Sequence, residues 1–114
     1  MAILLANCMT HGRRQFVDQI ENFPEACRHV LEVLGEVYLN DRTARQLDLS
    51  GEERLKFHQE HSGHLMDRLR EWMTWQQETK QVKPNSGLGK AINYFLKRWD
   101  ALTLFLRVPG GPAG

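Results

Sequence analysis

The stretch that decides the fold runs from residue 50 to residue 81 and reads SGEERLKFHQEHSGHLMDRLREWMTWQQETKQ. Ser50 followed by Glu53 is a capping-box pattern, in which each side chain bonds a backbone N–H of the other residue. Beyond this start, apolar residues recur on one helical face: Leu55, Leu65, Met66, Leu69, Trp72 and Met73. Only Gly63 disfavours a helix here, by about 1 kcal/mol relative to alanine. The pattern predicts one helix of roughly 45 Å, a length that usually packs as an antiparallel hairpin.

Two helices are predicted before this stretch. Pro24 suits the first position of a helix, because its missing N–H would have no partner there. The helix that it opens carries an apolar stripe with i, i+3, i+4 spacing: Cys27, Val30, Leu31, Leu34, Val37 and Tyr38. Nearer the N-terminus, Thr10 suits the cap of a helix that continues to Ile20.

A turn and a last helix follow the central stretch. Lys83-Pro84-Asn85 is typical of a turn, and Ser86 suits the cap of a helix over residues 87–107. The core face of this helix has nearly 3.6-residue spacing: Leu88, Ile92, Phe95, Trp99, Leu102 and Leu106. A second apolar face comprises Tyr94, Leu104 and Phe105. The last helix is therefore predicted to be buried on two sides.

The two ends of the chain differ from this helical pattern. Residues 3–8, ILLANC, form a short apolar run that predicts a buried strand, and no second strand is predicted to pair with it. The Pro- and Gly-rich residues 108–114 are predicted to be disordered. The predicted fold class is mainly α with one short N-terminal strand, divided into residues 1–11, residues 12–107 and a tail at 108–114.

Composition restricts the function classes. The chain has 114 residues and a formal net charge of +1, which suit one small domain without an overall basic field for nucleic acid. DNA contact would have to come from a local patch. The longest apolar runs are far shorter than the roughly 20 residues of a membrane span, and no signal peptide is predicted. With two cysteines, we expect a cytoplasmic protein whose thiols are reduced.

Two groups of residues have the spacing of metal ligands. Cys8 and His11 stand three residues apart, but a closed zinc site needs four ligands and no second Cys/His pair stands at matching spacing. His58, His61 and His64 also recur every third residue, and the first two would be neighbours on a helix. We interpret these three as polar residues on a helix surface, and we expect no metal site and no cofactor.

A small basic cluster at the predicted start of the first helix consists of His11, Arg13 and Arg14. Basic side chains of this kind contact DNA phosphates without reading the base sequence. An adjacent arginine pair is commonplace on a solvent-exposed helix, and the residues alone favour this interpretation over phosphate contact, which stays open. No arrangement of side chains in the sequence predicts a catalytic centre.

The tryptophans offer a different route to nucleic acid, because aromatic rings stack on bases. Trp72 and Trp99 lie on the predicted core stripes, so we expect them to pack inside the protein. Trp75 lies off the main stripe and is the one tryptophan that suits an exposed role.

Three stretches resemble a known family. They are LANCMTHGRRQFVD at residues 5–18, FHQEHSG at residues 57–63, and PNSGLGKA at residues 84–91 together with WDALTLFLR at residues 99–107. The chain resembles transposases of insertion-sequence family sixty-six, DDE-type enzymes with an RNase-H-like catalytic core. The resemblance covers nearly the whole chain. It implies that residues 3–8 are a strand of that core, that residues 12–107 are a helical insertion, and that the last helix packs against neighbours outside this chain.

The resemblance also bears on catalysis. It implies two catalytic aspartates before Met1 and a catalytic glutamate after Gly114, so the expected product is a truncated fragment that is inactive by itself. Full-length relatives would need a divalent metal such as Mg²⁺, held by those three carboxylates. Asp18 and Asp100 do not align with the catalytic positions. Gly12 stands where the family commonly has alanine, and we expect it to loosen the helix start.

The resemblance makes DNA at transposon ends the expected partner, with His11, Arg13 and Arg14 as the residues that contact it. The alternative is a DNA-binding or regulatory module that acts on transposon ends or on the full-length transposase. Self-association through exposed apolar helix faces is a further expectation. We expect no contact with membranes.

Overall fold

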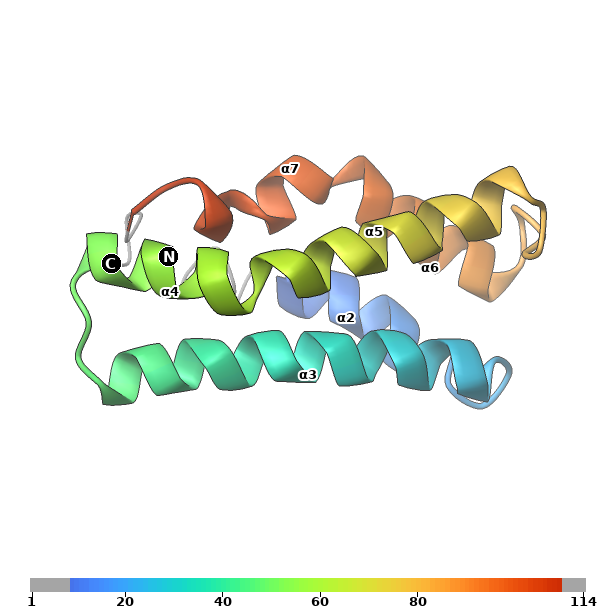
Figure 1. Cartoon of the computed structure of the whole chain (residues 1–114). Helices are drawn as coiled ribbons and strands as arrows, with labels where there is room; N and C mark the ends of the chain where they lie inside the picture. Colours follow the sequence, from blue (N-terminus) through green and yellow to red (C-terminus); the bar gives the residue numbers. More distant parts are fainter. Residues whose placement is uncertain (1–8, 110–114) are drawn as a thin grey trace.

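A computed structural model describes residues 9–109, and all of the regular structure in this range is helical (Figure 1). The elements are α2 (Thr10–Val17), α3 (Pro24–Gln46), α4 (Gly51–His61), α5 (Gly63–Glu78), α6 (Gly87–Lys97), α7 (Trp99–Leu102) and the 3₁₀ helix η2 (Leu104–Leu106). The prediction of a mainly helical protein is confirmed. The strand predicted at residues 3–8 lies outside the described residues, and so do residues 110–114 of the predicted tail.

Three predicted helix starts are confirmed. In the capping box the Glu53 N–H donates to Ser50 Oγ at 3.2 Å, and the Ser50 N–H donates to Glu53 Oε1 at 2.9 Å. Pro24 is the first residue of α3. At α6 the Gly89 N–H donates to Ser86 Oγ at 3.0 Å. These local hydrogen bonds satisfy backbone donors that have no partner in the first turn of a helix.

The first helix differs from its prediction at both ends. Thr10 does not cap it but is its first residue, and no side chain caps the preceding Met9 position. The Thr10 hydroxyl instead lies 3.1 Å from the Tyr38 hydroxyl of α3. The helix ends at Val17, before the predicted Ile20, and the Asp18 N–H bonds the Arg14 carbonyl.

The single helix predicted over residues 50–81 is wrong, because the chain divides into α4 and α5 at Ser62. Ser62 has φ −112° and ψ −25°, and its hydroxyl accepts a hydrogen bond from the Asn40 amide of α3 at 3.1 Å. Gly63 directly follows, and its low helix propensity weakens the helix at the same place. The predicted antiparallel hairpin is nevertheless formed, because α4 and α5 together run back along α3 (Figure 1).

The single last helix predicted over residues 87–107 is wrong as well. It breaks at Arg98 and at Thr103, whose ψ angles are 16° and 14°, into α6, α7 and η2. The buried Thr103 donates its hydroxyl hydrogen to the Trp99 carbonyl at 2.7 Å. Hydrogen bonds of this kind to the preceding turn bend helices.

Two helices end in a left-handed residue that is not glycine. Asp48 follows α3 with φ 54°, and Lys80 follows α5 with φ 56°. At Lys80 the N–H bonds the Gln77 carbonyl at 3.2 Å, and the next N–H bonds the Gln76 carbonyl at 3.1 Å. This pair of bonds is the Schellman motif, in which the left-handed position usually carries glycine.

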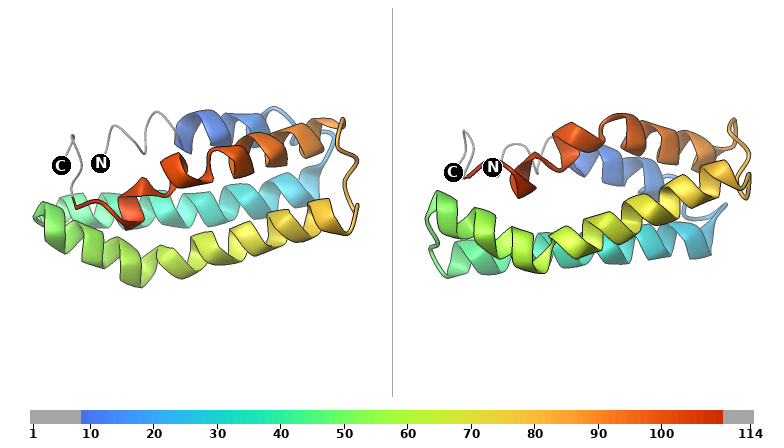
Figure 2. Two further views of the ribbon diagram at one scale, coloured as in Figure 1. Left: turned by 90° about the horizontal axis from the view of Figure 1, so that it is seen from above. Right: turned by 45° about the horizontal axis from the view of Figure 1, so that its top comes forward.

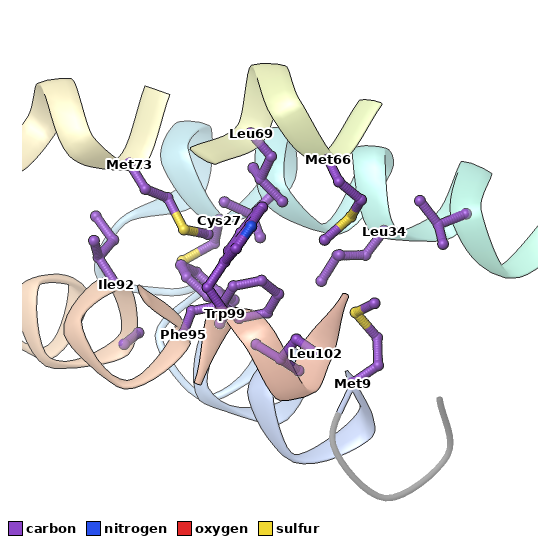
Figure 3. Close-up of a cluster of buried hydrophobic side chains, with 14 of the residues drawn as sticks. Met9, Cys27, Leu34, Met66, Leu69, Met73, Ile92, Phe95, Trp99 and Leu102 are labelled. Atoms are coloured by element: carbon purple, nitrogen blue, oxygen red, sulfur yellow. The ribbon is translucent and has the colours of Figure 1, made fainter. Parts of the chain in front are cut away.

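The core lies among these helices (Figures 1 and 2). The long α3 lies alongside α4 and α5, α6 and α7 return along the opposite side of the core, and α2 packs against both α3 and α6. Figure 3 shows side chains from these elements meeting in one cluster. The labelled members are Met9, Cys27, Leu34, Met66, Leu69, Met73, Ile92, Phe95, Trp99 and Leu102.

Part of the second apolar face predicted for residues 87–107 packs inside this chain. Phe105 is only 1% exposed, and its ring meets the His58 ring of α4 edge-on at 4.9 Å between centroids. The expectation that this face is left for parts outside the chain is therefore wrong for Phe105. It packs on α4 because the break at Thr103 turns η2 toward that helix.

Gly12 allows the close approach of α2 to α6. A Cβ added at Gly12 would lie 2.8 Å from two ring carbons of Phe95, which is fully buried. Phe95 also meets Phe16 of α2 edge-on, with ring centroids 5.9 Å apart. The missing side chain of Gly12 thus makes room for the Phe95 ring, and the expected loosening of the helix start stays a prediction.

Candidate nucleic-acid interface

The three basic residues predicted to contact DNA all lie exposed on α2. His11 and Arg14 are three residues apart and share one side of the helix, whereas Arg13 lies on the other side. Arg14 bonds Asp18 at 3.2 Å, and both side chains are well exposed. The structure therefore does not bring the three residues together as one cluster.

Arg13 lines an open groove between α2 and α3 with a volume of about 400 Å³. The other lining residues are Thr10 of α2 and Gly35, Tyr38 and Arg42 of α3. Positions 35, 38 and 42 lie on one side of α3, because steps of three and four residues return to the same helical face. Sequence reasoning missed Arg42, since nothing in the sequence says which face of α3 meets α2.

A second polar cluster lies inside the protein, where α3 meets the junction of α4 and α5. His58 is fully buried; its Nε2 lies 3.1 Å from Asp41 Oδ1, and its Nδ1 lies 2.9 Å from Ser62 Oγ. Asp41 also pairs with Arg45 at 3.0 Å. The interpretation of His58 as a polar surface residue is wrong. Its spacing after Leu55 on the apolar face of α4 is the pattern that would have indicated burial.

The donor and acceptor atoms of this cluster can be assigned. Asn40 Nδ2 can only donate, so Ser62 Oγ accepts from it at 3.1 Å. Burial raises the pKa of Asp41, but the hydrogen bond from His58 and the charges of Arg45 and Arg54 outweigh burial and hold the pKa below its usual value. The carboxylate therefore accepts from His58 Nε2–H. Ser62 and His58 are fully buried, so this Asp–His–Ser chain offers no surface to a substrate and serves to join the helices.

The remaining predicted site residues do not come together in one site. His61 and His64 are exposed, and among residues 9–109 no three His, Cys, Asp or Glu side chains are grouped so as to hold a metal ion. Trp75 is 52% exposed, as its position off the stripe predicted, whereas Trp99 is buried. Cys27 is a free, buried thiol whose pKa is raised by burial. Cys8 lies outside the described residues.

The chain matches a known protein family. The family described as "Transposase IS66 family" matches residues 1–112, nearly the whole chain. The chain belongs to this family. The resemblance drawn from the sequence motifs is thus confirmed.

Two relatives of this IS66-family chain come from Sinorhizobium fredii (strain NBRC 101917 / NGR234). The uncharacterized protein y4jD is 35% identical over 104 residues, which cover 90% of this chain and 19% of that protein. The uncharacterized protein y4hP is 34% identical over 116 residues, which cover 92% of this chain and 21% of that protein. The chain thus spans about a fifth of the length of these relatives. No solved structure matches it.

Within residues 9–109, no helix of this IS66-family chain combines the length and the apolar composition needed to cross a bilayer.

Proposed function

We propose that this chain serves DNA transposition as one helical segment of a longer IS66-family transposase and has no catalytic activity by itself. The observation that carries the proposal is the family match over residues 1–112. It is supported by the 19% and 21% of the relatives' lengths that the chain covers. The described residues offer no grouped ligands that fit the divalent metal of such an enzyme, so the proposal assigns no metal-dependent step to them.

The proposed role of the segment is to contact DNA through α2. His11, Arg13 and Arg14 are exposed there, and arginine side chains bind phosphate oxygens without regard to base sequence. Because the net charge is only +1, binding would depend on these exposed side chains, which lie on two sides of α2, and would weaken with salt. The proposal places this function in the cytoplasm.

Two measurements on the purified chain test the proposal. A labelled duplex carrying a terminal inverted repeat is incubated with the chain and Mg²⁺, and we expect no nicking or strand transfer. The same duplex should be retarded in a gel at low salt and released as the salt concentration rises. Metal-dependent cleavage would contradict the absence of catalysis. Failure to bind DNA at low salt would contradict the role of α2.

A second candidate function is association with a transposase or with another copy of the chain. It is favoured by two large exposed apolar side chains, Leu39 of α3 and Leu47 directly after that helix, which are 57% and 60% exposed. Sedimentation equilibrium of the wild-type chain and of a Leu39→Gln/Leu47→Gln variant tests it. A wild-type dimer that the double substitution dissociates would support association, and a wild-type monomer that also fails to bind full-length transposase would exclude it.

A further inference from the structure

The groove between α2 and α3 contains two positive charges that the described part of the chain does not neutralise. Arg13 and Arg42 line it from opposite helices, and neither forms an ion pair with any residue in the range 9–109. The nearby arginines on the same two helices do form ion pairs. Arg14 of α2 pairs with Asp18, and Arg45 of α3 pairs with Asp41. Among residues 9–109, no acidic side chain lines the groove.

The Gly35 lining of the groove leaves room for a ligand. A Cβ added at Gly35 would meet no atom of the described residues within 4 Å outside its own stretch of helix, so the α3 backbone is open to solvent at this position. The Thr10 and Tyr38 hydroxyls, which also belong to lining residues, lie 3.1 Å apart. Either hydroxyl can donate to the other, which leaves one O–H hydrogen for an acceptor in the groove.

We propose that this groove binds a phosphodiester group of nucleic acid, held between the guanidinium groups of Arg13 and Arg42. The inference rests on the proposed function and adds Arg42, Gly35 and the hydroxyl pair, which the sequence did not indicate. Guanidinium groups present several N–H donors in a plane, which matches the oxygen atoms of a phosphate. A phosphate between two arginines would receive donors from both helices and would tie α2 to α3.

The test is fluorescence anisotropy of a labelled DNA duplex, titrated with the full chain at several salt concentrations. The variants are Arg13→Gln, Arg42→Gln and the double substitution. Arg68→Gln, an equal charge change at an exposed position of α5 outside the groove, is the matched control. Thermal unfolding checks that every variant is folded, and we expect unfolding midpoints close to that of the wild-type chain, because these are surface changes.

We expect each groove substitution to weaken binding roughly tenfold and to reduce the slope of log affinity against log salt by about one, while Arg68→Gln changes affinity less than about twofold. Because both arginines hold the same phosphate, the double variant should lose less than the product of the two single effects. Equal weakening by Arg68→Gln would overturn the proposal, since binding would then reflect charge alone.

Further outcomes separate this site from the proposed function. If the chain binds DNA and both groove variants bind like wild type, the groove is overturned, and the proposed DNA contact through α2 is left to His11 and Arg14. If the chain binds no DNA but inorganic phosphate shifts the Gly35 amide resonance in NMR spectra, the nucleic-acid assignment and the proposed DNA contact are both overturned. If polyglutamate displaces the duplex at equal charge concentration, the groove accepts carboxylates and the phosphodiester assignment is overturned.

Discussion

His58 Nε2 lies 3.1 Å from Asp41 Oδ1, and this contact joins two buried polar residues on the facing helices α4 and α3. Asp41 continues the stripe that Leu34 and Val37 form on α3, and it is only 5% exposed. Burying such polar groups is unfavourable unless each has a partner. A shift of α3 along α4 would separate the two side chains, so the contact fixes how the helices are aligned.

Replacing His58 by leucine should therefore destabilise the fold. The change leaves Asp41 and Ser62 buried without their histidine partner, and an unsatisfied buried group costs about 1–3 kcal/mol. The free energy of unfolding in urea measures the effect. His64→Leu is the control, because His64 is exposed on α5, and equal stability of the two variants would contradict a structural role for the buried cluster.

Stability should also fall in acid because of Asp41. Its pKa is lower in the folded chain than the ordinary value of 3.8, so its contribution is present above that value and is lost as pH falls through the folded pKa. Urea unfolding between about pH 5 and about pH 2 should show this loss. Asp41→Asn should flatten the curve, whereas Asp67→Asn at an exposed position of α5 should retain the wild-type slope. If the wild-type chain and both variants gave identical curves, the loss of stability in acid could not be assigned to Asp41.

Alanine should have opposite effects at two glycines. In Gly12→Ala the new methyl group would lie 2.8 Å from the buried Phe95 ring, and overpacking of this kind costs about 1–3 kcal/mol. In Gly35→Ala it meets open space, so the gain in helix propensity should stabilise the chain by about 1 kcal/mol. Thermal unfolding compares the two, and a Gly12→Ala variant as stable as Gly35→Ala would show that α2 and α6 are not in close contact.

Glycine should stabilise the end of α5. Lys80 has φ 56°, a left-handed conformation that costs roughly 1–2 kcal/mol for most residues other than glycine. We expect Lys80→Gly to raise the free energy of unfolding by about 1 kcal/mol. Asp48→Gly, at the corresponding position after α3, should gain less because aspartate tolerates this conformation better. A loss of stability in Lys80→Gly would contradict the left-handed helix end.

Much of the fold could be predicted because it is encoded locally. The capping box at Ser50 and Glu53, Pro24 at the start of α3 and Ser86 at the start of α6 each act within one helical turn. Apolar spacing likewise indicated most of the core residues. Helix ends were harder, because neither Asp48 nor Lys80 is the glycine that usually marks a left-handed end.

The candidate site could be predicted only in part, because it depends on contacts between helices. Arg13 was indicated by its neighbours in the sequence, but Arg42 enters the groove only because α2 folds against α3. The burial of His58 depends in the same way on Asp41, seventeen positions earlier. Polar residues on otherwise apolar stripes are the local pattern that would have indicated such a pair.

The most direct test of DNA contact through α2 and α3 is an NMR titration of the isotopically labelled chain with a short DNA duplex at low salt. The amide resonances of Arg13, Gly35 and Arg42 should shift together and saturate with a single dissociation constant. Shifts confined to α5 and α6, or none at all, would contradict the proposed interface.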